Sequence, residues 1–192
     1  MIFYNHKQQP GFSLIELLVS VGILTMITTI VLANHTRFNG SVLLGSLAYD
    51  IALSVRQAQV FGLSVREFSS DFQVAYGVRI AGSNEYFLFV DRDGNQKYDD
   101  ATDAVIETYT LGRGHIISEF CGYSSSGTPA CSSSFPAITY LDIVFNRPDP
   151  DALMSSNEPG SYSRGTVTVM SGSGDTRTIE IASTGQISVQ NP

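Results

Sequence analysis

A long apolar segment near the start of the chain most constrains how this sequence can fold. From Phe12 to Ala33 the only formally charged side chain is that of Glu16. At about 1.5 Å of rise per residue, a helix over this segment would be about 33 Å long, against about 30 Å for the hydrocarbon core of a bilayer. The segment therefore predicts a single membrane-spanning helix.

The rest of the chain predicts one folded body beyond that helix. The chain has 192 residues, of which 43% are hydrophobic and 15% charged, which excludes a disordered chain and a polytopic membrane protein. Lys7 is the only Lys or Arg before Phe12, and positive charge favours the cytoplasmic side of a membrane. We therefore expect the residues before the helix in the cytoplasm and the head outside it.

Glu16 is the unusual residue of the apolar segment. A charged carboxylate within lipid costs roughly 2.5 kcal/mol or more, so an unpaired Glu16 is disfavoured there. A cationic partner is one explanation, and a carboxylate that reaches back to the membrane surface is the alternative. A secretory signal is a further alternative, because Val31-Leu32-Ala33 could serve as a cleavage site, although such signals have apolar cores of only about 7 to 15 residues.

The residues around Glu16 carry a resemblance to a known family. The stretch Gly11-Phe12-Ser13-Leu14-Ile15-Glu16-Leu17 resembles the class III signal of type IV prepilins and of the pseudopilins of type II secretion. The resemblance implies that a prepilin peptidase cleaves after Gly11 and methylates the new amine of Phe12. It also implies that Glu16 pairs with the terminal amine of a neighbouring subunit, since opposite charges attract strongly in a low dielectric.

The same resemblance implies where the protein acts and with what. Its partners would be other pilin or pseudopilin subunits, the prepilin peptidase and an assembly platform in the bacterial inner membrane. The chain would span that membrane once and enter a filament on assembly.

A helical pattern continues beyond the membrane segment. Apolar side chains recur at steps of three and four residues, which predicts an amphipathic helix that ends at Gly62. Its apolar face comprises Leu44, Leu47, Ala48, Ile51, Val55, Ala58 and Phe61. The chain thus divides into a cleaved leader at 1–11, a transmembrane and assembly helix at 12–33, its amphipathic continuation at 34–62 and an extracytoplasmic head at 63–192.

Beyond Asp71 the apolar pattern changes to alternation, which is typical of β-strands. Strands are predicted at 72–80, 85–90, 105–111, 138–145, 166–169, 178–181 and 186–189, the last three as an antiparallel meander. Residues 146–165 hold three Pro and little periodicity, so a long surface loop is predicted there. A long N-terminal helix packed on an antiparallel β-sheet is an α+β arrangement similar to the pilin fold, and the chain most resembles the minor pseudopilins of the GspH and FimT type.

The segment from Asp91 to Asp103 resembles the acidic loops that bind calcium. Five side chains supply the oxygen atoms that hard cations prefer, namely Asp91, Asp93, Asn95, Asp99 and Asp103. The EF-hand pattern is broken, because Gln96 stands where that pattern requires Gly and Thr102 where it requires an acid. A solvated hairpin turn is the alternative, since Asp-Gly-Asn is common in turns.

Cys121 and Cys131 enclose a segment rich in Gly, Ser and Pro. In a head outside the cytoplasm a disulfide between them is expected, and two buried thiols are the alternative. The spacing of the pair does not suit a metal site.

The sequence shows no catalytic, nucleotide-binding or zinc pattern, so a non-enzymatic protein is expected. A formal net charge of -7 and isolated Lys and Arg residues argue against nucleic-acid binding. Some FimT-type subunits bind DNA through basic residues near the C-terminus, but Gln186 stands where an Arg would be wanted. We expect a structural minor pseudopilin of a type II secretion or type IV pilus-like filament. The alternatives are a DNA-uptake or surface-binding minor pilin and a membrane-tethered calcium-binding domain.

Overall fold

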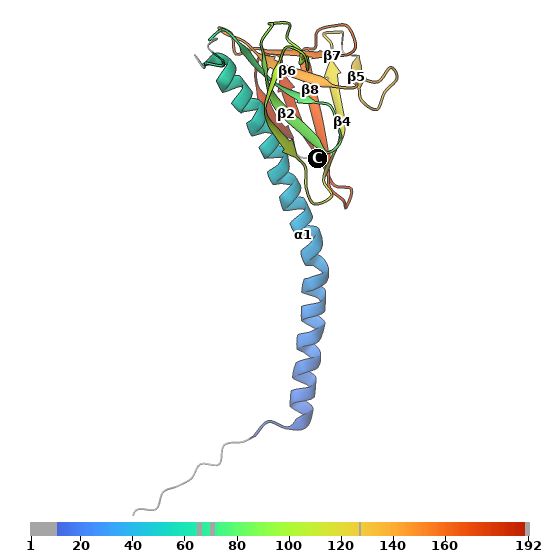
Figure 1. Ribbon diagram of the computed structural model, residues 1–192. Helices are drawn as coiled ribbons and strands as arrows, with labels where there is room; N and C mark the ends of the chain where they lie inside the picture. The colour runs from blue at the N-terminus through green and yellow to red at the C-terminus, as the bar shows by residue number, and fades with distance from the viewer. Residues whose placement is uncertain (1–10, 65–66, 70–71, 127, 191–192) are drawn as a thin grey trace, which may run out of the picture. The chain divides into compact units, whose positions relative to one another are not determined.

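The computed structural model describes residues 11–64, 67–69, 72–126 and 128–190. For residues 33–41 it describes the backbone only. In this part of the chain, helix α1 (Leu14–Leu63) is followed by ten strands (Figure 1). They are β1 (Ala75–Ile80), β2 (Glu85–Asp91), β3 (Ala104–Thr110), β4 (Ile116–Tyr123), β5 (Pro129–Cys131), β6 (Leu141–Phe145), β7 (Ala152–Ser156), β8 (Arg164–Met170), β9 (Thr176–Ala182) and β10 (Ile187–Gln190). The chain divides into two compact units, Met1–Asn39 and Gly40–Pro192, and α1 contributes to both.

The strands of the second unit form two antiparallel sheets. The first has the order β3-β2-β1-β6-β7 and the second the order β10-β9-β8-β4-β5. Strands far apart in the sequence pair in each sheet, with Tyr76 opposite Phe145 in the first and Phe120 opposite Val167 in the second. The expected α+β, pilin-like arrangement of an apolar N-terminal helix and antiparallel strands is confirmed, with the strands in two sheets rather than one.

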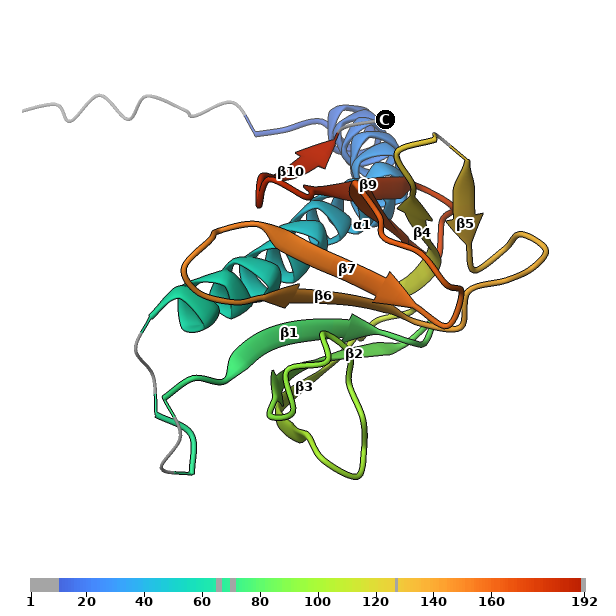
Figure 2. The same cartoon turned by 90° about the horizontal axis from the view of Figure 1, so that it is seen from above.

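The C-terminal part of α1 shares one core with both sheets. Figure 2 shows this part of the helix between β9 and β10 on one side and β6 and β7 on the other. Its buried apolar side chains include Leu44, Ala48, Ile51, Val55 and Ala58, all within the apolar face that the sequence predicts. They pack against inward-facing residues of both sheets, such as Val78 and Ile179. Each large aliphatic side chain buried in this way contributes about 1.5 to 3 kcal/mol to stability.

Two glycines permit close contacts around the end of this helix. Gly62 is buried, and a Cβ atom there would lie 2.3 Å from the carbonyl O of Phe145. Gly185 adopts a φ of 78° in the turn before β10, where a Cβ atom would lie 2.1 Å from the carbonyl O of Pro150. Gln59 of α1 donates hydrogen bonds from Nε2 to the carbonyl O atoms of Pro150 and Gly185, which ties this turn to the helix.

The prediction of a surface loop over residues 146–165 is wrong. Strand β7 lies within this range and pairs with β6, with Leu153 opposite Val144. Met154 is buried in the core, whereas Leu153 packs on the other face of the sheet. Five residues between two proline-containing segments give too short a pattern to recognise, so the strand depends on the edge that β6 provides. Strands β4 and β5 were not predicted either.

Candidate functional site

The residues of the prepilin-like motif lie at the start of α1. Gly11 and Phe12 precede the helix and are exposed. The Oγ atom of Ser13 accepts a hydrogen bond from the backbone N–H of Glu16 at 3.3 Å, and the carbonyl O of Ser13 accepts one from Leu17 at 3.2 Å. Ser13 and Glu16 follow the capping-box pattern of Ser with Glu three residues later. The helix therefore begins directly after the predicted cleavage position.

The position of Glu16 does not by itself compensate for its charge. Its side chain is exposed, and within the described ranges no cationic group lies at ion-pair distance from its carboxylate. The positive end of a helix dipole stabilises a carboxylate in the first turn by about 0.3 to 1 kcal/mol. This gain is smaller than the roughly 2.5 kcal/mol that a charge costs within lipid, so a further cationic partner is favoured.

The segment Leu14–Leu32 is long and apolar enough to cross a membrane, and none of it is buried. Its four hydroxyl side chains all donate hydrogen bonds back to carbonyl O atoms of the same helix. They are Ser20 to Glu16, Thr25 to Gly22, Thr28 to Leu24 and Thr29 to Thr25. Because an unsatisfied polar group in lipid costs several kcal/mol, this segment is suited to lipid or to packing against other apolar helices.

The acidic loop connects β2 to β3, and its first and last carboxylates approach each other. Carboxylate oxygens of Asp91, Asp93 and Asp103 all lie within 4.8 Å of one another. Asp91 is 1% exposed, and its two oxygens accept hydrogen bonds from the backbone N–H groups of Gly94 and Gln96 at 2.8 and 2.9 Å. The turn is thus built around the Asp91 carboxylate.

Asn95 turns its amide nitrogen toward the acidic side chains. The Nδ2 atom donates to carboxylate oxygens of Asp93 and Asp99, while Oδ1 accepts the backbone N–H of Lys97. Asp99 lies outside the group of three carboxylates. Of the five predicted calcium ligands, the structure therefore brings together Asp91, Asp93 and Asp103, and Asn95 would have to rotate to offer its oxygen to a cation.

The environment of Asp91 raises the pKa of its carboxyl above the ordinary value. Burial raises the pKa of the Asp91 carboxyl, the N–H groups of Gln96 and Gly94 lower it, and the neighbouring acids Asp93 and Asp103 raise it again. A divalent cation would neutralise this repulsion, and carboxylates are the ligands that calcium prefers. Calcium takes about six to eight oxygens, so the three carboxylates fit part of such a coordination shell.

A buried ion pair holds the acidic loop against the first sheet. Arg79 of β1 lies opposite Asp142 of β6, and two N–H···O contacts of 2.6 Å join their side chains. The Asp142 side chain is fully buried and also accepts the backbone N–H of Tyr98, in the acidic loop, at 3.1 Å. The guanidinium lies over the rings of Tyr98 and Tyr140, at 5.0 and 4.0 Å from their centroids.

Sequence reasoning missed this cluster, because Arg79 and Asp142 are 63 residues apart and only the pairing of β1 with β6 brings them together. The Ser13 cap, in contrast, has a signal in the sequence, namely Ser followed by Glu at the third position. The capping pattern could therefore have located the start of the helix.

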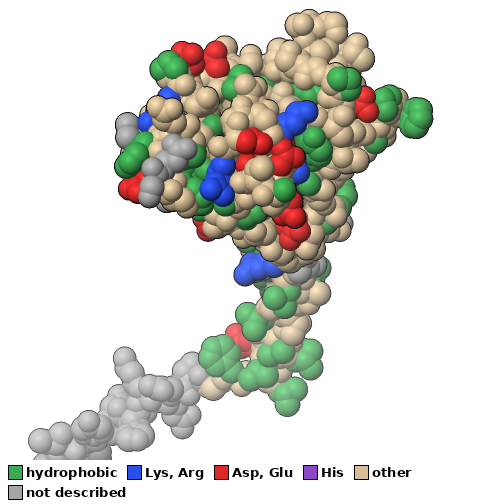
Figure 3. Space-filling view, turned by 45° about the horizontal axis from the view of Figure 1, so that its top comes forward, with side chains coloured by type: hydrophobic (Ala, Val, Ile, Leu, Met, Phe, Trp, Pro, Cys, Tyr) green, Lys and Arg blue, Asp and Glu red, His purple; other side chains and the backbone are tan. Residues whose placement is uncertain are grey.

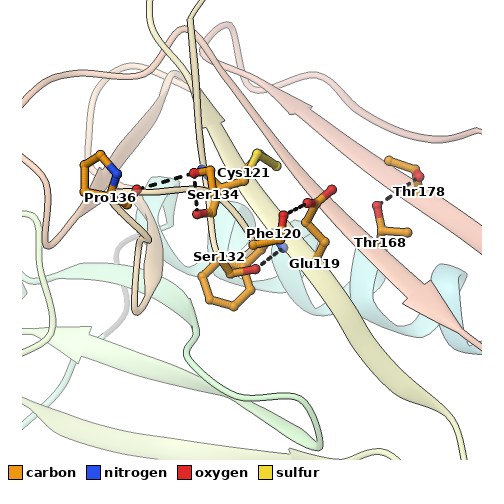
Figure 4. The surroundings of a disulfide bond; sticks show 10 residues. Glu119, Phe120, Cys121, Ser132, Ser134, Pro136, Thr168 and Thr178 are labelled. Carbon is orange, nitrogen blue, oxygen red and sulfur yellow. Dashed lines mark hydrogen bonds between the residues drawn. A yellow bond between two sulfur atoms is a disulfide. The ribbon is translucent and has the colours of Figure 1, made fainter.

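A disulfide joins Cys121 and Cys131, which lie opposite each other in β4 and β5 (Figure 4). Both cysteines of the chain are used in this bond. Their Cα atoms are 4.0 Å apart, so the bond crosses a directly opposed strand pair. It closes the segment 122–130 into a loop.

Charges on the head are mixed. On the face shown in Figure 3, Lys and Arg side chains are interspersed with acidic ones. Two arginines, Arg79 and Arg164, lie in ion pairs with acids. Gln186, where the FimT resemblance would require a basic residue, is exposed in the turn before β10. The prediction that the chain does not bind nucleic acid stays a prediction.

Comparison with known proteins bears on the N-terminal motif. Residues 6–32 match the family model described as the prokaryotic N-terminal methylation motif, of which residues 6–10 lie outside the described ranges. Neither characterised proteins nor solved structures give a match. The matched motif indicates a pilin-type subunit that is processed by prepilin peptidase and assembles with other pilin-type subunits. Together with the apolar segment Leu14–Leu32, it is consistent with membrane anchoring.

Proposed function

We propose that this chain is a structural minor pseudopilin, in the filament of a type II secretion or type IV pilus-like machine. The observation that carries the proposal is the methylation motif at the start of the apolar segment Leu14–Leu32, none of which is buried. The GspH and FimT type is supported by the layout of one long helix followed by antiparallel strands. The head would lie outside the cytoplasm, and the protein would have no enzymatic activity.

In the proposed mechanism, processing creates the group that directs assembly. Cleavage after Gly11 frees the amine of Phe12, and this amine stays cationic after methylation. Lipid and protein interiors are similarly apolar, so transfer of the helix from one to the other gains little from hydrophobicity. Assembly therefore depends on helix packing and on specific contacts, of which the pairing of Glu16 with the amine of a neighbouring Phe12 is the one we propose.

Loss of residues 1–11 with gain of one methyl group is expected only when a prepilin peptidase is present. The measurement is the intact mass of the membrane-extracted chain, expressed with and without the peptidase. A Gly11→Val variant is expected to keep the leader, because a β-branched side chain hinders the approach of the enzyme to the backbone. Cleavage after Ala33, or no cleavage in the presence of the peptidase, would contradict the proposed function.

We also propose that the acidic loop binds calcium, because carboxylate oxygens of Asp91, Asp93 and Asp103 lie within 4.8 Å of one another. Calcium is expected to raise the melting temperature of the full chain in detergent, and a chelator to reverse the change. A ligand at a hundred times its Kd stabilises a fold by about 2.7 kcal/mol.

Asp93→Asn is expected to abolish this response to calcium. Asp175→Asn is the matched control, because Asp175 is an exposed carboxylate in the turn between β8 and β9. A melting temperature that is the same with calcium and with chelator would exclude the site. Equal loss of the response in both variants would show that calcium acts on the surface charge in general.

A further inference from the structure

The segment between β4 and β6 combines an unusual composition with an unusual exposure. From Gly122 to Tyr140 the sequence contains no Asp, Glu, Lys, Arg or His. The part that follows β5 extends away from the sheets in both views (Figures 1 and 2). Phe135 lies in this part and is 101% exposed, the highest value among the large hydrophobic side chains that the structure describes. An aromatic side chain is thus held in water without charged neighbours in the sequence.

The part that follows β5 is the loop 132–140. Hydrogen bonds and the disulfide hold the first half of this loop. The Cys121–Cys131 disulfide fixes its start to β4 (Figure 4). Ser134 Oγ accepts the N–H of Cys131 at 3.0 Å and donates to the carbonyl O of the same residue at 2.9 Å. Ser132 Oγ accepts the N–H of Phe120 at 3.1 Å.

The second half of the loop is anchored as well. Ile138 is 2% exposed and belongs to the main core. Asn157 accepts the N–H of Thr139 at 2.6 Å and donates to the carbonyl O of Ala137 at 3.3 Å. Phe135 is therefore presented by a loop that is fixed on both sides, and a fixed loop loses less conformational entropy on binding than a free one.

These properties are those of a protein-binding surface. The centres of protein interfaces are enriched in aromatic residues and depleted of charged ones, and binding loops are often rich in Ser, Gly and Tyr. A lipid surface is not favoured, because the segment has no Lys or Arg to attract anionic headgroups. An aromatic anchor of this kind fits an apolar pocket on a partner protein.

The symmetry of a filament indicates that the partner protein is a neighbouring subunit. A filament that grows by helical repetition of its subunits is built from head-to-tail contacts that do not close, so each head offers different patches to its two neighbours. We propose that Phe135 and its loop form one of these patches and fill an apolar pocket on the head of a neighbouring pilin-type subunit. This inference rests on the proposed function as a filament subunit.

The test places a photo-crosslinking phenylalanine analogue at position 135 of the full chain, in cells that assemble the filament. The expected product is a light-dependent link to a chain whose own N-terminal residue is methylated. Phe72 provides the matched control, since it is a half-exposed phenylalanine in a segment outside this loop. The analogue at Phe72 is expected to give at least tenfold less product, and equal yields from both positions would overturn the proposal.

A third probe at Leu24, which is 66% exposed in the apolar helix, tests the filament function separately. Links from Leu24 but none from Phe135 would overturn the loop contact and leave the filament function standing. A link from Phe135 to a chain without a methylated N-terminus would also overturn the proposed loop contact. No link from either position, with an uncleaved leader, would contradict the filament function and the inference together.

Discussion

Replacement of Arg79 by methionine is expected to lower the free energy of unfolding of the head by about 3 to 5 kcal/mol. The reason is that the Asp142 carboxylate is fully buried and would lose its cation. The variant also loses the stacking of the guanidinium on Tyr98 and Tyr140. The measurement is urea unfolding of the full chain in detergent, followed by the near-ultraviolet circular dichroism of the tyrosines.

The pH dependence of this loss has a definite sign. Burial raises the pKa of the Asp142 carboxyl, and Arg79 opposes the rise. A carboxyl with a raised folded pKa contributes stability below its unfolded pKa, and this contribution is lost as the pH rises through the folded pKa. Without Arg79 the folded pKa rises further, so the difference between wild type and variant should widen as the pH rises through the two folded pKa values, both of which lie above the ordinary value of 3.8. A constant difference would contradict the role of the charge.

Two further variants separate the ion pair from other effects. Arg164→Met is the matched control, because Arg164 also stacks on a tyrosine and pairs with an acid, Glu180, but at 3.5 Å and with a side chain 42% exposed. A loss of at most about 1 kcal/mol is expected there. Arg79→Met combined with Asp142→Leu should recover most of the loss, since no unpaired charge then stays buried. A double variant as unstable as the single one would indicate a packing role for Arg79.

The parts of the fold that sequence reasoning predicted are those with a local pattern. The step of three and four residues from Leu44 to Phe61 predicts the buried face of α1, and alternation predicts strands such as β1 and β9. The division into two sheets depends on pairings such as β1 with β6, which join segments far apart in the chain. No local period contains that information, so a single sheet and a loop at 146–165 were the natural expectations.

The candidate functional residues also divide into those that a continuous stretch of sequence reveals and those that only folding brings together. The motif from Gly11 to Glu16 is continuous, so its residues can be read directly from the sequence. The acidic loop is continuous too, but its internal hydrogen bonds turn the nitrogen of Asn95 to the carboxylates, which composition cannot show. The ion pair between Arg79 and Asp142 exists only in the folded sheet.

Glu16→Ala is expected to leave membrane insertion intact and to reduce incorporation into filaments at least about tenfold, which corresponds to about 1.4 kcal/mol. Insertion should persist, because the substitution removes a charge that costs roughly 2.5 kcal/mol or more in lipid. Incorporation should fall, because the amine of a neighbouring Phe12 would lose its anion in a low dielectric. The measurement is the fraction of the chain in sheared filaments relative to the membrane fraction, with leader removal checked by mass.

Two control variants decide whether the charge of Glu16 or the start of the helix matters. Glu16→Gln keeps the size and polarity of the side chain but removes its charge. Ser13→Ala keeps the charge and removes the Oγ that accepts the N–H of Glu16, at a cost of about 1 kcal/mol in helix stability. If pairing with an amine directs assembly, Glu16→Gln fails as Glu16→Ala does, while Ser13→Ala still assembles. The opposite result would show that Glu16 acts by starting the helix, because capping then matters and charge does not.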